Sequence, residues 1–381
     1  MRVILEAQHA VGHPQPRGVG HYAIQIIQTL LSRRTFDYGL AYFDCNGEAG
    51  NRKRAEKYFG SFHVPFYECN ELDYRVASRD DARYGIKTYN EWTGSEGEIY
   101  HFMSPVCVPV NLDGKMIVTI HDLSWCSNPG VLSEHETDLF KTGRRRIEQV
   151  RPVIITDSDS SRNEILKYMD KIRPEQVKKV YLSYDEKNMF PEKNAGPFNE
   201  ESRYLFFVGA FERKKNIACL IKAYDIVAAK DKELKLVIAG KPTWDDTSEI
   251  YDAVNTSPYR NRIVMPGYIS AEQKRKLYSN ALCFVFPSIC EGFGIPVLEA
   301  MACGCPVITA DNTSLPEVGG DAAIYVDAHS IEQLAFRMEQ VITLESLRRD
   351  MVARGFIQVK KFSWDRTAAQ VENIYRNVSS K

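Results

Sequence analysis

Short apolar runs alternate along most of the chain with segments in which apolar residues recur at helical spacing. Runs of four to eight apolar residues that end on polar ones favour buried strands. In the first half the predicted strands span 2–7, 39–44, 98–102, 115–122 and 152–158, and the predicted helices span 20–31, 133–149 and 160–170. Strands separated by helices are typical of a parallel sheet with crossover helices.

The same alternation begins again after residue 203. Residues 184–203 are mostly polar and contain two prolines and a glycine, a composition typical of an interdomain linker. Beyond them, the predicted strands span 203–210, 235–240, 262–268, 283–288, 306–310 and 323–327, and the predicted helices span 216–230, 270–281 and 296–304.

We therefore predict two doubly wound, Rossmann-like α/β domains that face each other across a cleft. The domains cover residues 1–184 and 204–363, and residues 185–203 link them. The length of 381 residues fits two hydrophobic cores better than one. Ligands are expected at the carboxyl ends of the parallel strands.

Composition narrows the classes of partner. Lysine and arginine (49) nearly balance aspartate and glutamate (50), so no global field favours nucleic acid and any anion must be held locally. Nine cysteines without a pairing pattern predict free thiols in a reducing cytoplasm, and none is spaced for zinc. Because no 18 apolar residues are consecutive, we expect a soluble protein or one that touches a membrane surface.

The segment EGFGIPVLEA, residues 291–300, carries a candidate phosphate site. Glu291 follows a predicted strand, and Glu299 is expected in the first turn of the next helix, where Pro296 suits an early position. The glycine-rich turn between them offers backbone N–H groups at a helix N-terminus, which favours an anion. The two glutamates can bind hydroxyl groups beside it. The alternative is an ordinary strand-to-helix turn.

A basic run provides a second candidate at the same edge of the predicted sheet. Arg213, Lys214 and Lys215 follow the strand predicted at 203–210 and precede a helix. Three cations at the carboxyl end of a parallel strand suit a diphosphate. A solvated basic loop is the alternative.

Four segments in this order, VGAFERKKNI, VIAG, PSICEGFGIPVLEAMACGCPVI and SLPEVGGDAAIYVD, resemble the C-terminal half of glycosyltransferase family 4. The resemblance covers nearly all of residues 204–378. It implies a retaining, nucleotide-sugar-dependent enzyme with the two-domain GT-B fold. Since residues 362–378 resemble the closing helix of the family, helix 364–381 is expected to complete the first domain.

The resemblance also implies roles for residues of the second domain. Glu291 would contact hydroxyls of the donor sugar, Glu299 the nucleotide ribose and Lys215 the diphosphate. Lys214 stands where the family often has arginine, and Arg213 would support it. The backbone amides expected to line the phosphate and the sugar ring belong to Phe293, Gly294 and Ile295.

The first domain resembles the family in two shorter motifs. RGVGHYAIQII resembles the N-terminal glycine loop, which implies that Gly18, Val19 and Gly20 meet the donor phosphate across the cleft. His121 and Asp122 match a His-Asp pair in which the histidine approaches the transferred sugar and the aspartate orients the loop.

The function expected from this resemblance is transfer of a hexose to an acceptor hydroxyl. Mannose is favoured, from GDP-mannose or a UDP-hexose, and the acceptor would be a glycan or a lipid-linked glycan in surface polysaccharide or glycolipid synthesis. No metal and no cofactor beyond the donor is expected. A cytoplasmic location is predicted, with contact to the inner membrane surface through GRRR at 143–146 as one interpretation and a solvated helix face as the other.

Several other functions fit parts of the sequence. GVGHYA at 18–23, with Asp44 further on, satisfies the fingerprint of NAD-dependent oxidoreductases, although the strand ends about ten residues too early. A sugar-nucleotide epimerase or phosphorylase could share the fold, a glycosidase also uses two carboxylates, and a binding module needs no catalysis. DSDS at 157–160 could bind a metal as Asp-x-Asp, but capping of the next helix is favoured.

Overall fold

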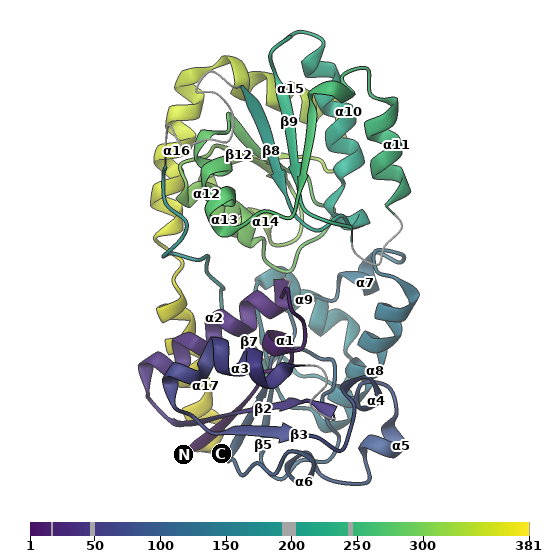
Figure 1. Cartoon of the computed structure of the whole chain (residues 1–381), viewed down its shortest axis with the longest axis vertical. Helices are drawn as coiled ribbons and strands as arrows, with labels where there is room; N and C mark the ends of the chain where they lie inside the picture. The colour runs from purple at the N-terminus through teal and green to yellow at the C-terminus, as the bar shows by residue number, and fades with distance from the viewer. Residues whose placement is uncertain (17, 46–49, 193–202, 243–246, 381) are drawn as a thin grey trace. The chain divides into compact units, whose positions relative to one another are not determined.

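The computed structural model describes residues 1–16, 18–45, 50–192, 203–242 and 247–380 (Figure 1). The chain divides into two compact units. The first comprises residues 1–127, 134–182 and 364–381, and the second comprises 128–133 and 183–363. The expected linker, 185–203, is therefore assigned to the second unit, and its residues 193–202 lie outside the described part.

The first unit is built on a seven-stranded sheet in which every pairing is parallel. The strand order is β3-β2-β1-β4-β5-β6-β7, and the paired strands β1 and β4 stand where the order reverses. Its strands are β1 (Arg2–Glu6), β2 (Asp37–Phe43), β3 (Phe66–Cys69), β4 (Ile99–Phe102), β5 (Lys115–Thr119), β6 (Val153–Thr156) and β7 (Val177–Lys179).

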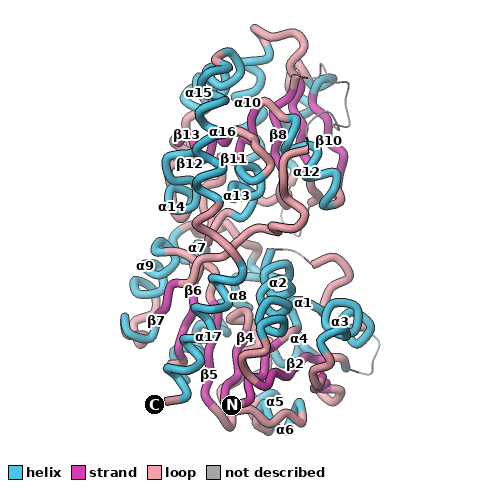
Figure 2. Tube along the Cα trace, turned by 90° about the vertical axis from the view of Figure 1, so that its left-hand side faces the viewer, coloured by secondary structure: helices cyan, strands magenta, loops and turns pink. Residues whose placement is uncertain are grey.

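Helices flank this sheet (Figure 2). Its central strands β1, β4 and β5 are accordingly buried along most of their length and apolar at most positions. The helices of the unit are α1 (Gln8–Val11), α2 (Gly18–Arg33), α3 (Asn51–Phe59), α4 (Tyr74–Ala77), α5 (Asp81–Tyr84), α6 (Tyr89–Thr93), α7 (Ser124–Ser127), α8 (Glu134–Val150), α9 (Asp159–Tyr168) and α17 (Trp364–Ser379).

The C-terminal helix α17 packs against α2, although more than 300 residues separate them in the chain (Figure 1). Arg33 donates both Nε and Nη2 to the carboxylate of Glu372, each at 3.1 Å. Glu372 is buried, so this bidentate contact compensates for its desolvation. The ring of His101 on β4 is bonded through Nδ1 to the hydroxyl of Tyr375 at 2.7 Å.

The second unit repeats the architecture with six parallel strands in the order β10-β9-β8-β11-β12-β13. They are β8 (Tyr204–Val208), β9 (Lys235–Ala239), β10 (Ile263–Gly267), β11 (Cys283–Phe286), β12 (Val307–Ala310) and β13 (Ala323–Val326). The helices are α10 (Ile217–Ala228), α11 (Ser248–Thr256), α12 (Ala271–Asn280), α13 (Ile295–Ala302), α14 (Leu315–Gly319), α15 (Ile331–Thr343) and α16 (Glu345–Val359).

The two parallel sheets confirm the predicted doubly wound α/β class. In the second unit the order reverses between β8 and β11, so the segments that follow these two adjacent strands run to opposite faces and leave a crevice at their carboxyl ends. All nine cysteines are free, as predicted. Among the described helices, none combines the length and the apolar character needed to cross a bilayer.

Candidate functional site

The reversal point of the second sheet brings together a lysine and a glutamate that are 76 residues apart in the sequence. Lys215 ends a short 3₁₀ turn, η4 (Arg213–Lys215), after β8, and Glu291 follows β11. Lys215 Nζ donates to Glu291 Oε1 at 2.6 Å. The two side chains are 13% and 10% exposed, so the charges compensate each other in a largely desolvated place. Ser288 Oγ also donates to Oε1, at 2.5 Å.

The basic segment is anchored to the neighbouring strand ends. Asn216 adopts a left-handed conformation (φ +57°) between η4 and α10, and its side-chain amide donates to the carbonyls of Pro287 (3.1 Å) and Ala328 (2.6 Å). Ile289 N donates to the carbonyl of Lys214 at 2.7 Å. The segment is therefore not wholly solvated: its backbone is fixed and the Lys214 side chain is only 17% exposed, whereas Arg213 is exposed.

The turn after Glu291 leads directly into α13. Gly294 caps this helix with φ +106°, and a Cβ there would lie 2.9 Å from Leu315 Cδ2, so the position requires glycine. Ile295 is the first helical residue, and Pro296 occupies the early position predicted for it. The first N–H groups of a helix have no partner within it, and the helix dipole adds positive potential there. The turn is thus suited to an anion.

A loop after β12 holds the turn in place. Thr313 Oγ1 accepts a hydrogen bond from Glu291 N at 3.1 Å, and Ser314 Oγ donates to the carbonyl of Phe293 at 2.8 Å. The ring of Phe293 is buried and packs edge-on against Phe362, with 5.8 Å between centroids. The backbone of Phe293 is therefore fixed on both sides, while its side chain belongs to the core.

Glu299 lies deeper in α13 than predicted. The helix begins at Ile295, so Glu299 starts the second turn rather than standing in the first. Its side chain is 9% exposed, and Oε1 accepts from Lys274 Nζ at 2.5 Å. The Tyr278 hydroxyl lies 3.3 Å from Oε2 and 3.3 Å from the carbonyl oxygen of Pro296, so the two acceptors share its one proton. Sequence reasoning missed both partners, and the available signal was their spacing of four residues on the predicted helix 270–281.

The predicted glycine loop of the first unit is a helix. Gly18, Val19 and Gly20 form the first turn of α2, and a Cβ on Gly20 would lie 2.6 Å from the carbonyl oxygen of His9 on α1. The glycine is thus explained by close helix packing. Since α1 intervenes between β1 and these glycines, the strand-turn-helix geometry of the NAD fingerprint is absent, which overturns that interpretation.

His121 follows β5 and is held by the end of β6. Its Nδ1 is bonded to Asp157 Oδ2 at 2.6 Å, and the ring of Tyr22 stands edge-on at 4.7 Å between centroids. Burial lowers the pKa of His121, but the charge and hydrogen bond of Asp157, with Asp122, outweigh burial and raise it. Asp122 Oδ1 accepts from Ser124 Oγ at 2.6 Å and so fixes the loop after His121.

The segment 157–160 caps a helix, as favoured. Ser158 is the N-cap of α9, and its hydroxyl accepts from Ser161 N at 3.0 Å. Asp157 instead binds His121, a role that the sequence did not reveal. Within the described residues, no three His, Cys, Asp or Glu side chains gather where they could hold a metal ion.

The basic stretch 143–146 is engaged inside the first unit. Arg146 is buried and Arg145 is exposed, and both bind Asp81, at 2.7 and 2.6 Å. Arg144 pairs with Glu148 at 3.1 Å. The interpretation as a wholly solvated face is thus wrong for Arg146, whose charge is used to join α8 to α5.

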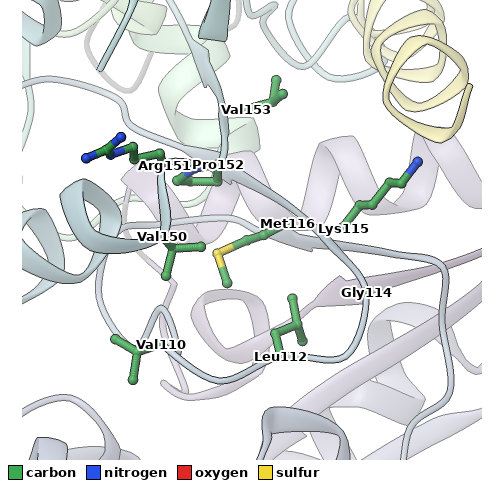
Figure 3. A pocket seen from close by; sticks show the side chains of 9 residues that line it. All are labelled: Val110, Leu112, Gly114, Lys115, Met116, Val150, Arg151, Pro152 and Val153. Carbon is green, nitrogen blue, oxygen red and sulfur yellow. The ribbon is translucent and has the colours of Figure 1, made fainter. Parts of the chain in front are cut away.

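A cavity of about 310 Å³ opens at the amino ends of β5 and β6 (Figure 3). Apolar side chains such as Val110, Leu112 and Met116 line it, and Lys115 lies at its rim. The Lys115 ammonium donates to the carbonyls of Val378 and Ser379, both at 2.9 Å. Because His121 follows the carboxyl end of β5, this cavity and His121 lie at opposite edges of the sheet.

The sequence is similar to several known proteins. The family described as "Glycosyl transferases group 1" matches residues 189–357. An O-antigen chain mannosyltransferase B of Escherichia coli is 26% identical over 94% of this chain and 96% of its own length. A serotype-specific mannosyltransferase of the same organism is 29% identical over 69% of this chain, which corresponds to about a third (34%) of that longer protein.

The fold has solved counterparts over the full length. A sucrose-phosphate synthase from Thermosynechococcus elongatus superposes with a TM-score of 0.76 at 18% identity, covering 100% of this chain and 99% of that one.

Proposed function

Because this chain belongs to the group 1 glycosyltransferases, we propose that it transfers a mannosyl group from a nucleoside diphosphate sugar to an acceptor hydroxyl, with retention of configuration. The observation that carries the proposal is the buried Lys215–Glu291 pair at the mouth of the α13 turn. The pair places a cation that can bind a diphosphate beside a carboxylate that can accept hydrogen bonds from sugar hydroxyls. The names of the two Escherichia coli relatives support mannose, and one of them names the O-antigen chain, which supports a role in polysaccharide synthesis.

The diphosphate is proposed to rest on the amides of Gly294 and Ile295 and on Lys215, with Arg213 and Lys214 adding positive potential. Negative charge on the leaving group grows as the glycosidic bond stretches. Fixed amides and cations stabilise that growing charge more than they stabilise the ground state, which lowers the barrier. We propose that they do so in place of a metal.

When the donor binds, Glu291 is proposed to accept hydrogen bonds from the sugar, and the Lys215 ammonium is proposed to bind the phosphate. Each residue then interacts with the donor instead of with the other residue. The carboxylate then also stands near the positive charge that develops at the anomeric carbon. His121, with the first turn of α2, is proposed to contribute contacts to the donor from the first unit, as the resemblance implies. The acceptor is proposed to be a glycan or a lipid-linked glycan.

A panel of nucleotide sugars, with and without EDTA, tests the proposal. GDP-mannose is expected to be turned over fastest and EDTA to have no effect. Lys215→Ala and Glu291→Ala should each lower turnover by about 10²- to 10³-fold, the usual effect of removing one strong electrostatic contact. The matched control is the exposed pair of Lys230 and Glu339, whose ammonium and carboxylate are 2.7 Å apart. Alanine variants of both catalytic-site residues with near-normal turnover would overturn the assignment.

A further inference from the structure

Helix α12 presents two side chains to Glu299. Lys274 and Tyr278 are four residues apart and therefore share one face of the helix. Lys274 binds Oε1 at 2.5 Å. The Tyr278 hydroxyl lies 3.3 Å from Oε2 and equally far from the carbonyl oxygen of Pro296, so each carboxylate oxygen has a donor from α12 on the same side, the stronger being Lys274. Each oxygen of an ionised carboxylate has further acceptor capacity. The carboxylate is thus oriented with one lone pair per oxygen engaged by α12.

The lysine of this pair is less buried than the glutamate. The Lys274 side chain is 24% exposed, against 9% for Glu299. An ammonium group has three protons, and one of them binds Oε1. The pair therefore places the carboxylate oxygens of Glu299, which accept hydrogen bonds, beside the ammonium of Lys274, which donates them. The ammonium is the part of the pair that is more accessible to solvent. That pattern is complementary to a vicinal diol, in which each hydroxyl both donates and accepts.

We propose that Lys274 is a ribose-recognition residue of the nucleotide site: it orients the carboxylate of Glu299, and its ammonium donates to one ribose hydroxyl while the carboxylate accepts from the diol. The inference rests on the proposed function, which supplies the nucleotide. It adds a residue from α12, outside the turn and the basic segment, and it gives the short Lys274–Glu299 contact a role in substrate selection as well as in packing.

The surface of the same helix provides a matched control. Lys276 binds Glu272 at 2.7 Å, and Glu272 is 63% exposed. This second lysine on α12 has the same chain length and charge but does not contact Glu299. Lys276→Met therefore removes one positive charge from α12 without disturbing the buried carboxylate.

A cycle of protein variants and nucleotide analogues tests the proposal by calorimetry. Binding of UDP and GDP is compared with binding of their 2′-deoxy and 3′-deoxy forms. We expect the wild type to prefer the better ribonucleotide over at least one deoxy form by about 10-fold or more, the usual value of a hydrogen bond to a charged group. Lys274→Met should bind the ribonucleotide about 10- to 100-fold more weakly and lose most of that preference, whereas Lys276→Met should keep both.

The outcomes separate the two proposals. Failure of the wild type to bind any nucleoside diphosphate overturns the proposed function and this inference together. If the wild type prefers the ribonucleotide and Lys274→Met keeps that preference in full, the inference is overturned and the proposed function is not. Lys274→Arg, which keeps the charge, is expected to restore part of the preference. If Lys274→Met does not fold, Lys274→Gln retains a donor to Glu299 without the charge and enters the same cycle, with the same criteria.

Discussion

Lys215 Nζ lies 2.6 Å from Glu291 Oε1, and each residue follows one of the two strands that flank the reversal point of the second sheet. Topology alone explains the encounter, since β8 and β11 are adjacent and parallel. This ion pair is also how the two residues are arranged when the proposed site holds no ligand. Each charge is satisfied by the other until a ligand offers the lysine a phosphate and the glutamate a hydroxyl.

The stability of single and double variants should show how strongly these charges depend on each other. Lys215→Met and Glu291→Gln each leave one largely buried group without its partner and are expected to cost about 3 kcal/mol in the free energy of unfolding. The double variant should cost clearly less than the sum. Urea unfolding of the wild type, the two single variants and the double variant gives the coupling free energy of this double-mutant cycle. The same cycle at Lys230 and Glu339 should give a coupling below about 1 kcal/mol because the pair is exposed. Equal couplings at both places would contradict the assignment.

Gly294→Ala should damage both the fold and the candidate site. The residue has φ +106°, and the new methyl group would lie 2.9 Å from Leu315 Cδ2, so strain and a clash together are expected to cost about 1 to 3 kcal/mol. Gly130→Ala is the matched control, because Gly130 also has a positive φ (+86°) but a Cβ there meets no atom within 4 Å. Thermal unfolding compares the two. A smaller decrease in stability for Gly294→Ala than for Gly130→Ala would show that the Leu315 side chain moves aside without cost.

Glu6 should make the first unit less stable as pH rises. Burial at the end of β1 raises the pKa of its carboxyl to about 7, although the N–H groups of Gln8 and Met103 partly oppose the shift. The unfolded value is 4.5, so the folded state binds the proton more tightly. Stability is then full below about pH 4.5 and falls by about 3 kcal/mol as pH rises through 7. Glu6→Gln should remove this loss.

Two histidines change the stability in the opposite direction, so their contributions must be distinguished from that of Glu6. Burial lowers the pKa of His9 to about 4 and of His101 to about 3, so both favour the folded state as pH rises toward 6.5. These contributions are common to the wild type and Glu6→Gln and cancel in their difference. Urea unfolding of both proteins between pH 4.5 and 8 gives that difference. A difference that stays constant over this range would refute a buried, proton-binding carboxyl.

Hydrophobic patterning predicted the architecture well because central parallel strands are apolar on both faces. The strand expected at 2–7 is β1, and the strand expected at 283–288 is β11. The edge strands β3 and β7 were missed, since they are four and three residues long and read FYEC and VKK, with charged residues that a solvated edge tolerates. The short helices between β3 and β4 were missed because each is held by local caps rather than by a periodic apolar face.

The candidate site was predictable where residues follow strand ends and unpredictable where tertiary packing chooses the partner. Lys215 and Glu291 were placed at one edge from topology, but their direct contact was not foreseen. The glycines at 18–20 were interpreted as a loop because a glycine needed for close helix packing and one needed for a turn look the same in a sequence. Asp157 carried no signal of its own, because it acquires its role from His121 on another element. Lys274 had only the signal of its helical spacing from Tyr278, which does not name Glu299 as its partner.

The contact between Asp157 and His121 makes a prediction that does not depend on catalysis. Asp157, which follows β6, faces the histidine together with the adjacent Asp122, Tyr22 from α2, and the neutral rings of His9 and His101. The carboxylates raise its pKa and the other two histidines give no charge to oppose them. Asp157→Asn keeps an acceptor for Nδ1 but removes the charge, so the pKa of His121 should fall while the ring stays in place.

Titration of ¹⁵N-labelled imidazoles by NMR measures this directly, with the His121 resonances assigned from a His121→Asn variant. Asp159→Asn is the matched control: it neutralises an aspartate two residues further on, which pairs with Lys179 at the surface. That variant should leave the titration of His121 unchanged. Because the folded pKa of His121 is raised, its stabilising contribution is present below about pH 6.5 and is lost as pH rises through the folded value, so Asp157→Asn should also weaken the protein most at low pH. An unshifted titration in Asp157→Asn would mean that burial, and not the carboxylate, governs the proton on this ring.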